Sequence, residues 1–207
     1  MTQKDRLKSQ LAFLHEIDAV KNIFRQTAVS GSVRQENDAE HSWHLAMMAM
    51  VLSEHAAEPV DTCRVIKMVL VHDLVEIDAG DTFCYDEQAA LDKSERETAC
   101  ADRLFALLPG EQGREMRALW EEFEAQQTPD ARFASALDRM QPIFQNHYTE
   151  GHSWVQHGIS RDQVLARNTI VRDAIPAAWE RVLEILDNGV AEGWLKAGDK
   201  TINHKGQ

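Results

Sequence analysis

Apolar residues recur at helical spacing along most of the chain. In residues 4–24 they fall three or four positions apart, which predicts an amphipathic helix. No segment alternates with the two-residue period of a strand. We therefore expect an all-α fold, a helical bundle of about seven to nine helices. The further helices are predicted over residues 39–55, 61–77, 87–108, 111–126, 161–173 and 176–188, with one more beginning at Pro129 after the cap Thr128.

Two polar segments lack this periodicity and predict loops, at residues 25–39 and 151–160. Neither repeats nor low-complexity stretches interrupt the 207 residues, a length that suits one domain of ordinary size. We expect a single domain over residues 1–198, with a core at about residues 20–150, C-terminal helices over residues 160–198 and a disordered tail at residues 199–207.

Composition and charge narrow the class of protein. With 43% hydrophobic and 27% charged residues, the chain has the balance of a globular protein. Its net charge of -12 disfavours binding to a nucleic-acid polymer, and no basic stripe is present. No apolar run reaches about 18 residues, which predicts no membrane-spanning helix. The polar N-terminus and three cysteines without paired spacing predict a cytoplasmic protein with no disulfide framework.

Four chemically active residues lie in or at the end of predicted helices: His41, His72, Asp73 and Asp138. Each taken alone is typical of a core histidine or a helix cap. Together, two imidazoles and two carboxylates are enough to hold one divalent ion, and inward-facing acids need such a shared cation because an unpaired buried carboxylate is costly. Nitrogen and oxygen donors suit Mn, Co, Fe, Ni, Zn or Mg and do not select among them.

The segments around these residues carry a family resemblance. RQENDAEHSW, VHDLVEIDAGD and ALDRM, within a stretch of about residues 10–150, resemble the HD-domain metal-dependent phosphohydrolases. The match is closer to the YfbR-like 5'-deoxynucleotidase group. The resemblance implies an HD-type helical bundle, a metal held by the four residues, and hydrolysis of deoxynucleoside 5'-monophosphates to deoxynucleosides and phosphate.

The resemblance also implies roles for three more residues. Arg25, just before the first-histidine segment, is implied to bind the substrate phosphate, with Arg34 and Lys93 as weaker candidates. Glu76 follows the His-Asp pair by one helical turn, and Asp81 lies in a turn that can fold back over the site. Either acid is a candidate for proton transfer to the leaving 5'-oxygen or from water. The alternative for Glu76 and Asp81 is a supporting carboxylate at a helix end, and the alternative for Arg25 is a surface cation or a partner of a carboxylate.

Two features bear on the cofactor and the substrate. Branches of the superfamily with two metals resemble one another in carrying histidines between the His-Asp pair and the last Asp. No histidine lies between His72 and Asp138 here, so we expect a single divalent ion and a phosphate-ester substrate. Gln26 stands where the bacterial nucleotidases of the group carry a Trp after the Arg, which leaves nucleotide selectivity open.

Three functions fit these observations. The first is a metal-dependent phosphomonoesterase that acts on (deoxy)nucleoside 5'-monophosphates. The second is an HD hydrolase that acts on another phosphate ester. The third is a non-catalytic helical dimerisation module whose metal is a structural staple, which predicts a closed coordination shell rather than an open position. Glu76 and Asp81 favour an enzyme, because a staple does not need them.

The expected partner is a small phosphorylated substrate, a nucleoside monophosphate, with no nucleic-acid polymer and no membrane. Apolar stripes on several helices are compatible with a homodimer, although the sequence does not locate its interface. One such stripe, formed by Trp43, Met47 and Met50, predicts core or interface packing. Three histidines near the second predicted loop fit either surface packing or a substrate pocket: His147, His152 and His157.

Overall fold

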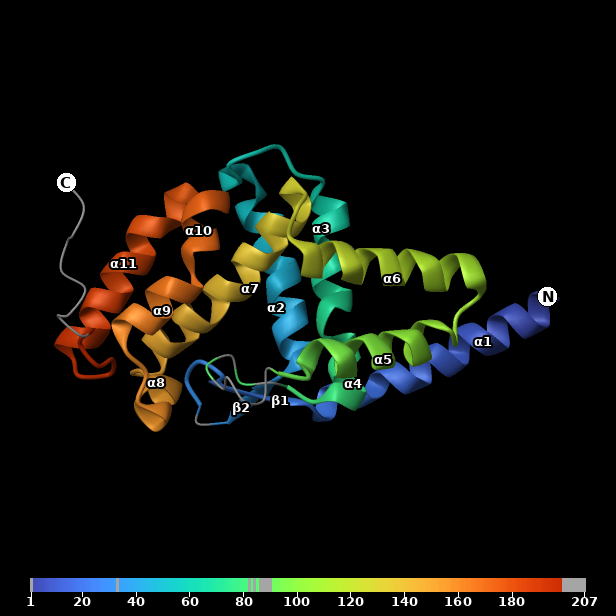
Figure 1. Ribbon diagram of the computed structural model, residues 1–207, viewed down its shortest axis with the longest axis horizontal. Coiled ribbons are helices and arrows are strands. Elements are labelled where there is room, and N and C mark those ends of the chain that lie inside the picture. Colours follow the sequence, from blue (N-terminus) through green and yellow to red (C-terminus); the bar gives the residue numbers. More distant parts are fainter. Residues whose placement is uncertain (1, 33, 82, 84, 86–90, 199–207) are drawn as a thin grey trace.

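The structure, a computed structural model, describes residues 2–32, 34–81, 83, 85 and 91–198. Helices dominate this part of the chain (Figure 1), which confirms the predicted all-α fold. The α-helices are α1 (Gln3–Glu16), α2 (Asp38–Leu52), α3 (Thr62–Val71), α4 (Glu76–Ala79), α5 (Lys93–Phe105), α6 (Gly110–Ala125), α7 (Pro129–Tyr148), α8 (His152–His157), α9 (Arg161–Arg167), α10 (Thr169–Ala174) and α11 (Pro176–Ala191). The remaining elements are the 3-10 segments η1 (Ile17–Asn22), η2 (Ser53–His55) and η3 (His72–Val75) and the strands β1 (Phe24–Ala28) and β2 (Gln35–Asn37).

Residues 25–39, which we expected to form a loop, contain an antiparallel hairpin instead. β1 pairs with β2 in a register that places Phe24 opposite Asn37 and Ala28 opposite Gln35. The strands are too short and too polar to show a strand period in the sequence. Their pairing satisfies backbone groups that would otherwise need other partners, because Arg25, Thr27 and the start of α2 lie close to the protein interior.

Two predicted helices are divided in the structure. The segment 61–77 forms α3, then tightens into the 3-10 segment η3, and continues as α4. The segment 161–173 breaks at Asn168, where α9 ends and α10 begins. Residues 87–90 of the predicted fourth helix and the predicted tail at 199–207 lie outside the described residues.

The second predicted loop, residues 151–160, contains the short helix α8. Gly151 and Gly158 bound it with positive φ angles of 69° and 63°. The side chain of Asn146 accepts hydrogen bonds from the backbone amides of Ser153 and Trp154, and so satisfies donors of the first turn. Six residues are too few for a helical period to be visible in the sequence, which explains the missed element.

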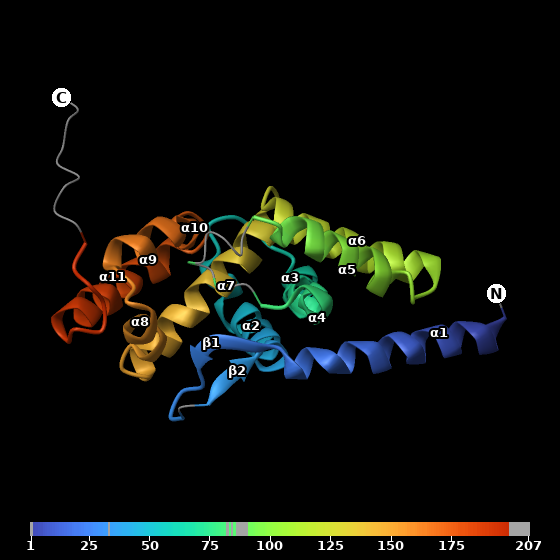
Figure 2. The same cartoon turned by 60° about the horizontal axis from the view of Figure 1, so that its bottom comes forward.

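Helix α7 forms the centre of the molecule. It packs against α2, α3, α6, α10 and α11 (Figure 1) and contributes Phe133, Leu137 and Met140 to the main hydrophobic core. A smaller cluster joins α5 to η3 around Leu104 and Val75. Helix α1 extends away from the centre (Figure 2). No helix in the described ranges combines the length and the apolar character needed to cross a membrane.

The elements α2, η3 and β1 bring reactive side chains together near the middle of α7. Helix α2 begins with a capping box, in which the Asn37 side chain accepts from the backbone amide of Glu40. This fixes the first turn of α2 and with it His41, which faces the core. The end of α3 presents η3 to the same place, and β1 runs beside them. The site is built where these elements meet α7.

Candidate metal centre

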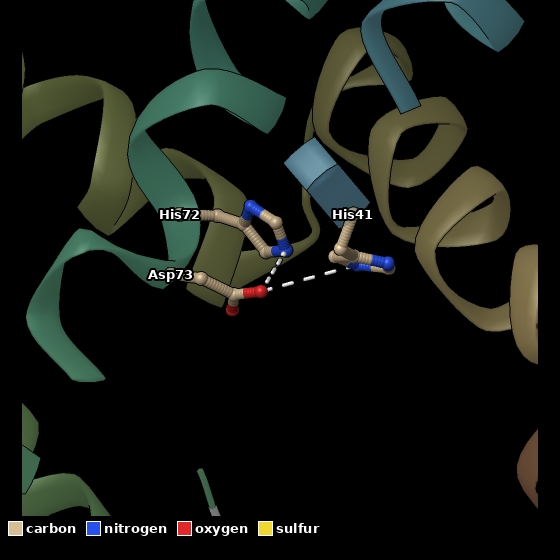
Figure 3. A group of neighbouring side chains, drawn as sticks. All are labelled: His41, His72 and Asp73. Atoms are coloured by element: carbon tan, nitrogen blue, oxygen red, sulfur yellow. Dashed lines mark ion pairs between the residues drawn. The ribbon is translucent and has the colours of Figure 1, made fainter. Parts of the chain in front are cut away.

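The four predicted ligands converge from three places in the chain. His41 comes from α2, His72 and Asp73 come from η3 at the end of α3 (Figure 3), and Asp138 comes from α7. His41 Nε2 lies 3.1 Å from Asp138 Oδ1 and 3.9 Å from Asp73 Oδ2. His72 Nε2 lies 3.1 Å from Asp73 Oδ2 and 3.9 Å from Asp138 Oδ1. Donors that share one ion at about 2.1 Å lie roughly 3.0–3.4 Å apart. The two distances of 3.1 Å fall in this range and the two of 3.9 Å exceed it, while the ligand atoms of His41, His72 and Asp73 all lie within 4.8 Å of one another, close enough to hold a metal ion together.

The Nδ1 atoms of the two histidines are both held by hydrogen bonds on the side away from the carboxylates of Asp73 and Asp138. His41 Nδ1 donates to Gln141 Oε1 at 3.2 Å, and His72 Nδ1 donates to the carbonyl oxygen of Val69 at 2.9 Å. In both rings Nε2 then faces the carboxylates: His41 Nε2 donates to Asp138 Oδ1 at 3.1 Å, and His72 Nε2 lies 3.1 Å from Asp73 Oδ2. A bound cation would take the place of the protons on these two nitrogens. His72 Nε2 is buried and has no hydrogen-bond partner among the described residues. Imidazoles held in this way are typical metal ligands, so the donor set fits a divalent cation.

The two aspartates carry negative charge at the centre. Burial raises the pKa of Asp73, but His72 and Arg25 outweigh it and the net pKa is lowered. Asp138 follows the same rule, with hydrogen bonds from His41 and His72 holding its pKa well below the ordinary value. Conversely, burial lowers the pKa of His72, while Asp73 and Asp138 raise it to about 10. The centre therefore attracts positive charge.

Arg25 lies among the candidate ligands. Its side chain, on β1, is 15% exposed. Nη1 is 2.8 Å from Asp73 Oδ2 and 3.2 Å from Asp38 Oδ1, and Nη2 is 3.8 Å from Asp138 Oδ1. Burial opposes its charge, but these acids raise its pKa well above the ordinary value. The guanidinium is thus held by carboxylates on several sides.

A hollow of about 150 Å³ opens beside the centre and contains the two predicted acid/base residues. Glu76, the first residue of α4, is buried, and its Oε2 has no hydrogen-bond partner among the described residues. Burial, together with Asp73, Asp38 and Asp81, raises its pKa to about 11. Asp81 also has a raised pKa, again chiefly because of burial. Both acids therefore favour the protonated form more than an ordinary carboxyl group does.

The structure brings six of the seven predicted site residues to the wall of this hollow, and His41 lies buried behind it. Lys93 lines the hollow too, and its Nζ is 3.2 Å from Glu97 Oε1. Arg34, the other weaker phosphate candidate, pairs with Glu40 instead, at 2.9 Å. His157 Nε2 donates to Gln26 Oε1 at 3.2 Å, and its ring lies 4.3 Å from that of Phe83, which lines the hollow, at a tilt of 37°.

Several polar residues around the centre were missed from the sequence. Glu36 is buried and accepts from Gln141 Nε2 at 2.8 Å and from Gln145 Nε2 at 2.6 Å. Asp38 is also buried, and its pKa is raised to about 7, first by burial and then by Asp73. Gln141 follows Asp138 by three positions on α7, so its place on the same face could have been inferred from helical spacing.

The apolar stripe on α2 faces solvent. Trp43, Met47 and Met50 are exposed, so these side chains do not pack in the core of the described residues, while interface packing, the other expectation for this stripe, stays a prediction. Helix α2 carries apolar residues on two faces, and only the face with Leu45 and Ala49 is covered. Periodicity shows that a face is apolar but does not show what covers it.

Similarity to known proteins shows the family to which this chain belongs. The chain matches the HD domain model over residues 17–179 and belongs to that family. It is 32% identical to the human 5'-deoxynucleotidase HDDC2 over 139 residues, which cover 67% of each protein. It is 34% identical to the Xenopus laevis protein of the same name, over 67% of this chain and 68% of that one. The curated relatives are thus matched over about two thirds of their length.

Two solved structures resemble this chain in fold. A protein from Magnetospirillum magnetotacticum MS-1, described as a predicted metal-dependent phosphohydrolase, is 48% identical and has a TM-score of 0.87, over 92% of this chain and 98% of that one. An HD-domain phosphohydrolase from Listeria innocua is 17% identical with a TM-score of 0.63, and shows the shared fold alone. The family and the class of enzyme predicted from the sequence are confirmed.

Proposed function

We propose that this protein is a metal-dependent phosphomonoesterase that hydrolyses deoxynucleoside 5'-monophosphates to deoxynucleoside and phosphate. The observation that carries the proposal is the convergence of two Nε2 atoms and two ionised carboxylates at the wall of a hollow that also holds an arginine and two acids of raised pKa. The names of the curated relatives support the choice of substrate.

His41, His72, Asp73 and Asp138 hold one divalent ion in this proposal, and Mn, Co, Fe, Ni, Zn or Mg all suit the donors. A bound ion of this kind supplies Lewis acidity to a phosphoryl oxygen and lowers the pKa of water. The protein contributes the fixed positions of the donors, since Gln141 and the Val69 carbonyl orient the two imidazole rings.

Arg25 places positive charge at the phosphate end of the hollow. Its contacts to Asp73 and Asp38 fix the guanidinium, so little side-chain freedom is lost when a phosphate binds beside it. It also offsets part of the repulsion between the phosphate dianion and the carboxylates that line the hollow.

Glu76 and Asp81 transfer the protons of the reaction in this proposal. Water attacks phosphorus, the bond between phosphorus and the 5'-oxygen breaks, and the leaving oxygen needs a proton. Glu76 has the more strongly raised pKa and donates that proton, while Asp81 accepts one from the attacking water.

A structural staple accounts for fewer of these observations. A staple needs a closed set of ligands, whereas here a hollow of about 150 Å³ opens beside them. It also gives no reason to bury Glu76 with Oε2 unpartnered, which costs about 1–3 kcal/mol of unfolding free energy. We therefore favour the enzyme over the dimerisation module.

We further propose a single HD domain over residues 1–198, acting as a homodimer in the cytoplasm on a small substrate. The exposed apolar side chains of Trp43, Met47 and Met50 support the homodimer. The free thiols of Cys63 and Cys100 suit a reducing compartment. The net charge of -12 supports a small substrate rather than a nucleic-acid polymer.

A phosphate-release panel tests the function. The substrates are deoxy- and ribonucleoside 5'-monophosphates, with sugar phosphates and nucleoside triphosphates for comparison, each with Mn, Co, Mg and Zn. We expect release from the deoxynucleoside monophosphates. No release from any monophosphate by protein that has bound metal would overturn the proposal, and release from another ester alone would support the second hypothesis.

A further inference from the structure

Arg139 occupies a junction between two hollows. It follows the candidate ligand Asp138 on α7, and it lines both the hollow of about 150 Å³ at the metal centre and a second hollow of about 90 Å³. The second hollow lies along α7, α8 and α9 and has apolar walls that include Ile143, Trp154 and Ile159. A substrate that spans the two hollows would lie against the residues that line both, and these include Arg139, Arg25 and Arg167.

One nitrogen of Arg139 lacks a partner. Its Nη1 is buried and makes no hydrogen bond within the described part of the chain. The nearest carboxylate contact of the side chain is from Nε to Asp138 Oδ2, at 3.9 Å, which is too long for a hydrogen bond. A buried donor left in this way is unfavourable, so an acceptor from outside the chain is expected there.

The other cations around the two hollows differ from Arg139 in this respect. Arg25 Nη1 is already shared by Asp73 and Asp38. Lys93 is paired with Glu97. Arg167 lines both hollows but is engaged in the fold. Among these groups, Arg139 has the donor that the protein itself does not satisfy.

We propose that Arg139 binds the substrate phosphate, donating from Nη1 to a phosphoryl oxygen at the neck between the hollows, while the nucleoside lies against α7, α8 and α9. This rests on the proposed function and adds a residue that the family motif does not name. A planar guanidinium suits a phosphate better than a point charge, because it can donate two parallel hydrogen bonds. The apolar walls of the second hollow suit the face of a nucleobase.

The substrate needs this second cation because of the local charge. Asp73, Glu76, Asp81 and Asp138 all line the hollow that receives the phosphate. A dianion that enters beside the ionised Asp73 and Asp138 is repelled by them, and the charge of Arg25 is largely offset by its own carboxylate partners. A cation with an unsatisfied donor at the wall of both hollows reduces that repulsion and fixes the orientation of the phosphate relative to the leaving 5'-oxygen.

The test compares Arg139→Gln and Arg139→Lys with Arg132→Gln. Arg132 is the matched control, since it lies on the same helix, is partly exposed and pairs with Glu58. The first measurement is the binding of inorganic phosphate to Mg-loaded protein by calorimetry. The second is kcat/KM for deoxyadenosine 5'-monophosphate, with metal content and thermal unfolding recorded for every variant.

We expect Arg139→Gln to weaken phosphate binding and to lower kcat/KM, each by about 10- to 150-fold, which corresponds to one hydrogen bond to a charged group. Metal content should stay unchanged. Arg139→Lys keeps the positive charge but lacks the two parallel donors of a guanidinium, so it should recover part of the loss. This variant also tests the proposal if Arg139→Gln does not fold. Arg132→Gln should match the wild type.

Phosphate affinity and kcat/KM of Arg139→Gln within about twofold of the wild type would overturn the proposal. So would a loss of metal from both Arg139 variants, because Arg139 would then act on Asp138 rather than on the substrate. If the wild type binds phosphate through Arg139 but hydrolyses no nucleotide, the proposed function fails and the phosphate site stands. If the wild type binds no phosphate at all, this inference fails whatever the substrate is.

Discussion

Gln141 Oε1 lies 3.2 Å from Nδ1 of His41, and the two side chains meet from α7 and α2 with almost no exposure to solvent. The amide of Gln141 is itself fixed, because its Nε2 donates to Glu36 at 2.8 Å. This short chain of hydrogen bonds determines which nitrogen of His41 carries the proton. It therefore turns Nε2 toward Asp138 and the metal centre.

Replacing Gln141 tests this relationship. Gln141→Met removes the acceptor for His41 Nδ1 with little change in volume, so the affinity for Mn²⁺ should fall by about 10- to 100-fold. Gln145→Met is the matched control, because Gln145 also donates to Glu36 but makes no hydrogen bond to His41 in the described part of the chain. Affinity is measured by competition with a chromophoric chelator. Equal affinities for the two variants would argue against the orienting role.

Variants of three carboxylates, Asp138, Asp81 and Glu76, should distinguish a metal ligand from the acid-base groups. Asp138→Ala removes a proposed ligand and should lose both metal and turnover. Asp81→Asn and Glu76→Gln should keep the metal and lose about 10²- to 10⁴-fold in kcat, the usual contribution of general acid-base groups. Elemental analysis and phosphate release are measured on the same samples. An active, fully metallated Asp138→Ala protein would refute the ligand assignment, and unchanged turnover of Asp81→Asn and Glu76→Gln would refute the acid-base assignment.

The pH dependence of stability follows from Glu76. Its pKa is raised to about 11 in the folded protein, by burial and then by Asp73, Asp38 and Asp81. Between its unfolded pKa and that value the folded state binds the proton more strongly, so the free energy of unfolding falls as the pH rises. Glu76→Gln cannot ionise and should lose this decline.

Metal-free Glu76→Gln should therefore be as stable as the metal-free wild type near pH 4 and more stable at pH 8. The gap should widen by up to about 1.4 kcal/mol for each pH unit. Chemical denaturation in the presence of a chelator, at several pH values, measures it. A constant gap from pH 4 to pH 8 would show that Glu76 ionises normally in the folded protein.

Sequence patterns predicted the long elements well and the short ones poorly. α2, α3 and α7 carry buried residues at helical spacing over ten or more positions, so periodicity located them. β1 and β2 have five and three residues, and their pairing depends on contacts across the hairpin that no local pattern contains. Helix α8 was missed because its six residues are too few to show a helical period.

For the site, the motif pointed to residues whose chemical type is unusual in a core. His41, His72 and Asp73 were recognised on that basis. Gln141 and Arg139 were not, because their importance depends on distances between different helices and on an unsatisfied donor. Neither property is local in sequence. For a related reason the sequence could not decide between core and interface packing for the exposed face of α2, because burial depends on which elements pack against a helix.

That exposed face leads to a prediction about assembly. Trp43, with 64% of its surface exposed, and Met50, with 58%, lie on the uncovered side of α2. In a homodimer with two-fold symmetry each substitution acts twice, so Trp43→Asp with Met50→Asp should convert dimer to monomer. Sedimentation velocity measures the change. Val155→Asp, at an exposed apolar residue on α8, is the control. A wild type that sediments as a monomer, or a double variant that stays dimeric, would exclude this interface.

The most direct measurement is a titration of metal-free protein with Mn²⁺ in which bound metal and hydrolysis of deoxyadenosine 5'-monophosphate are followed together. Turnover should be absent at the start, rise in proportion to the bound ion and level off at about one ion per chain. Asp138→Ala should gain neither metal nor turnover over the same range. A plateau at two ions would contradict the single-ion proposal and make Glu76 and Asp81 candidate ligands. Full turnover without metal, or none with the metal bound, would contradict the assignment of this centre as the active site.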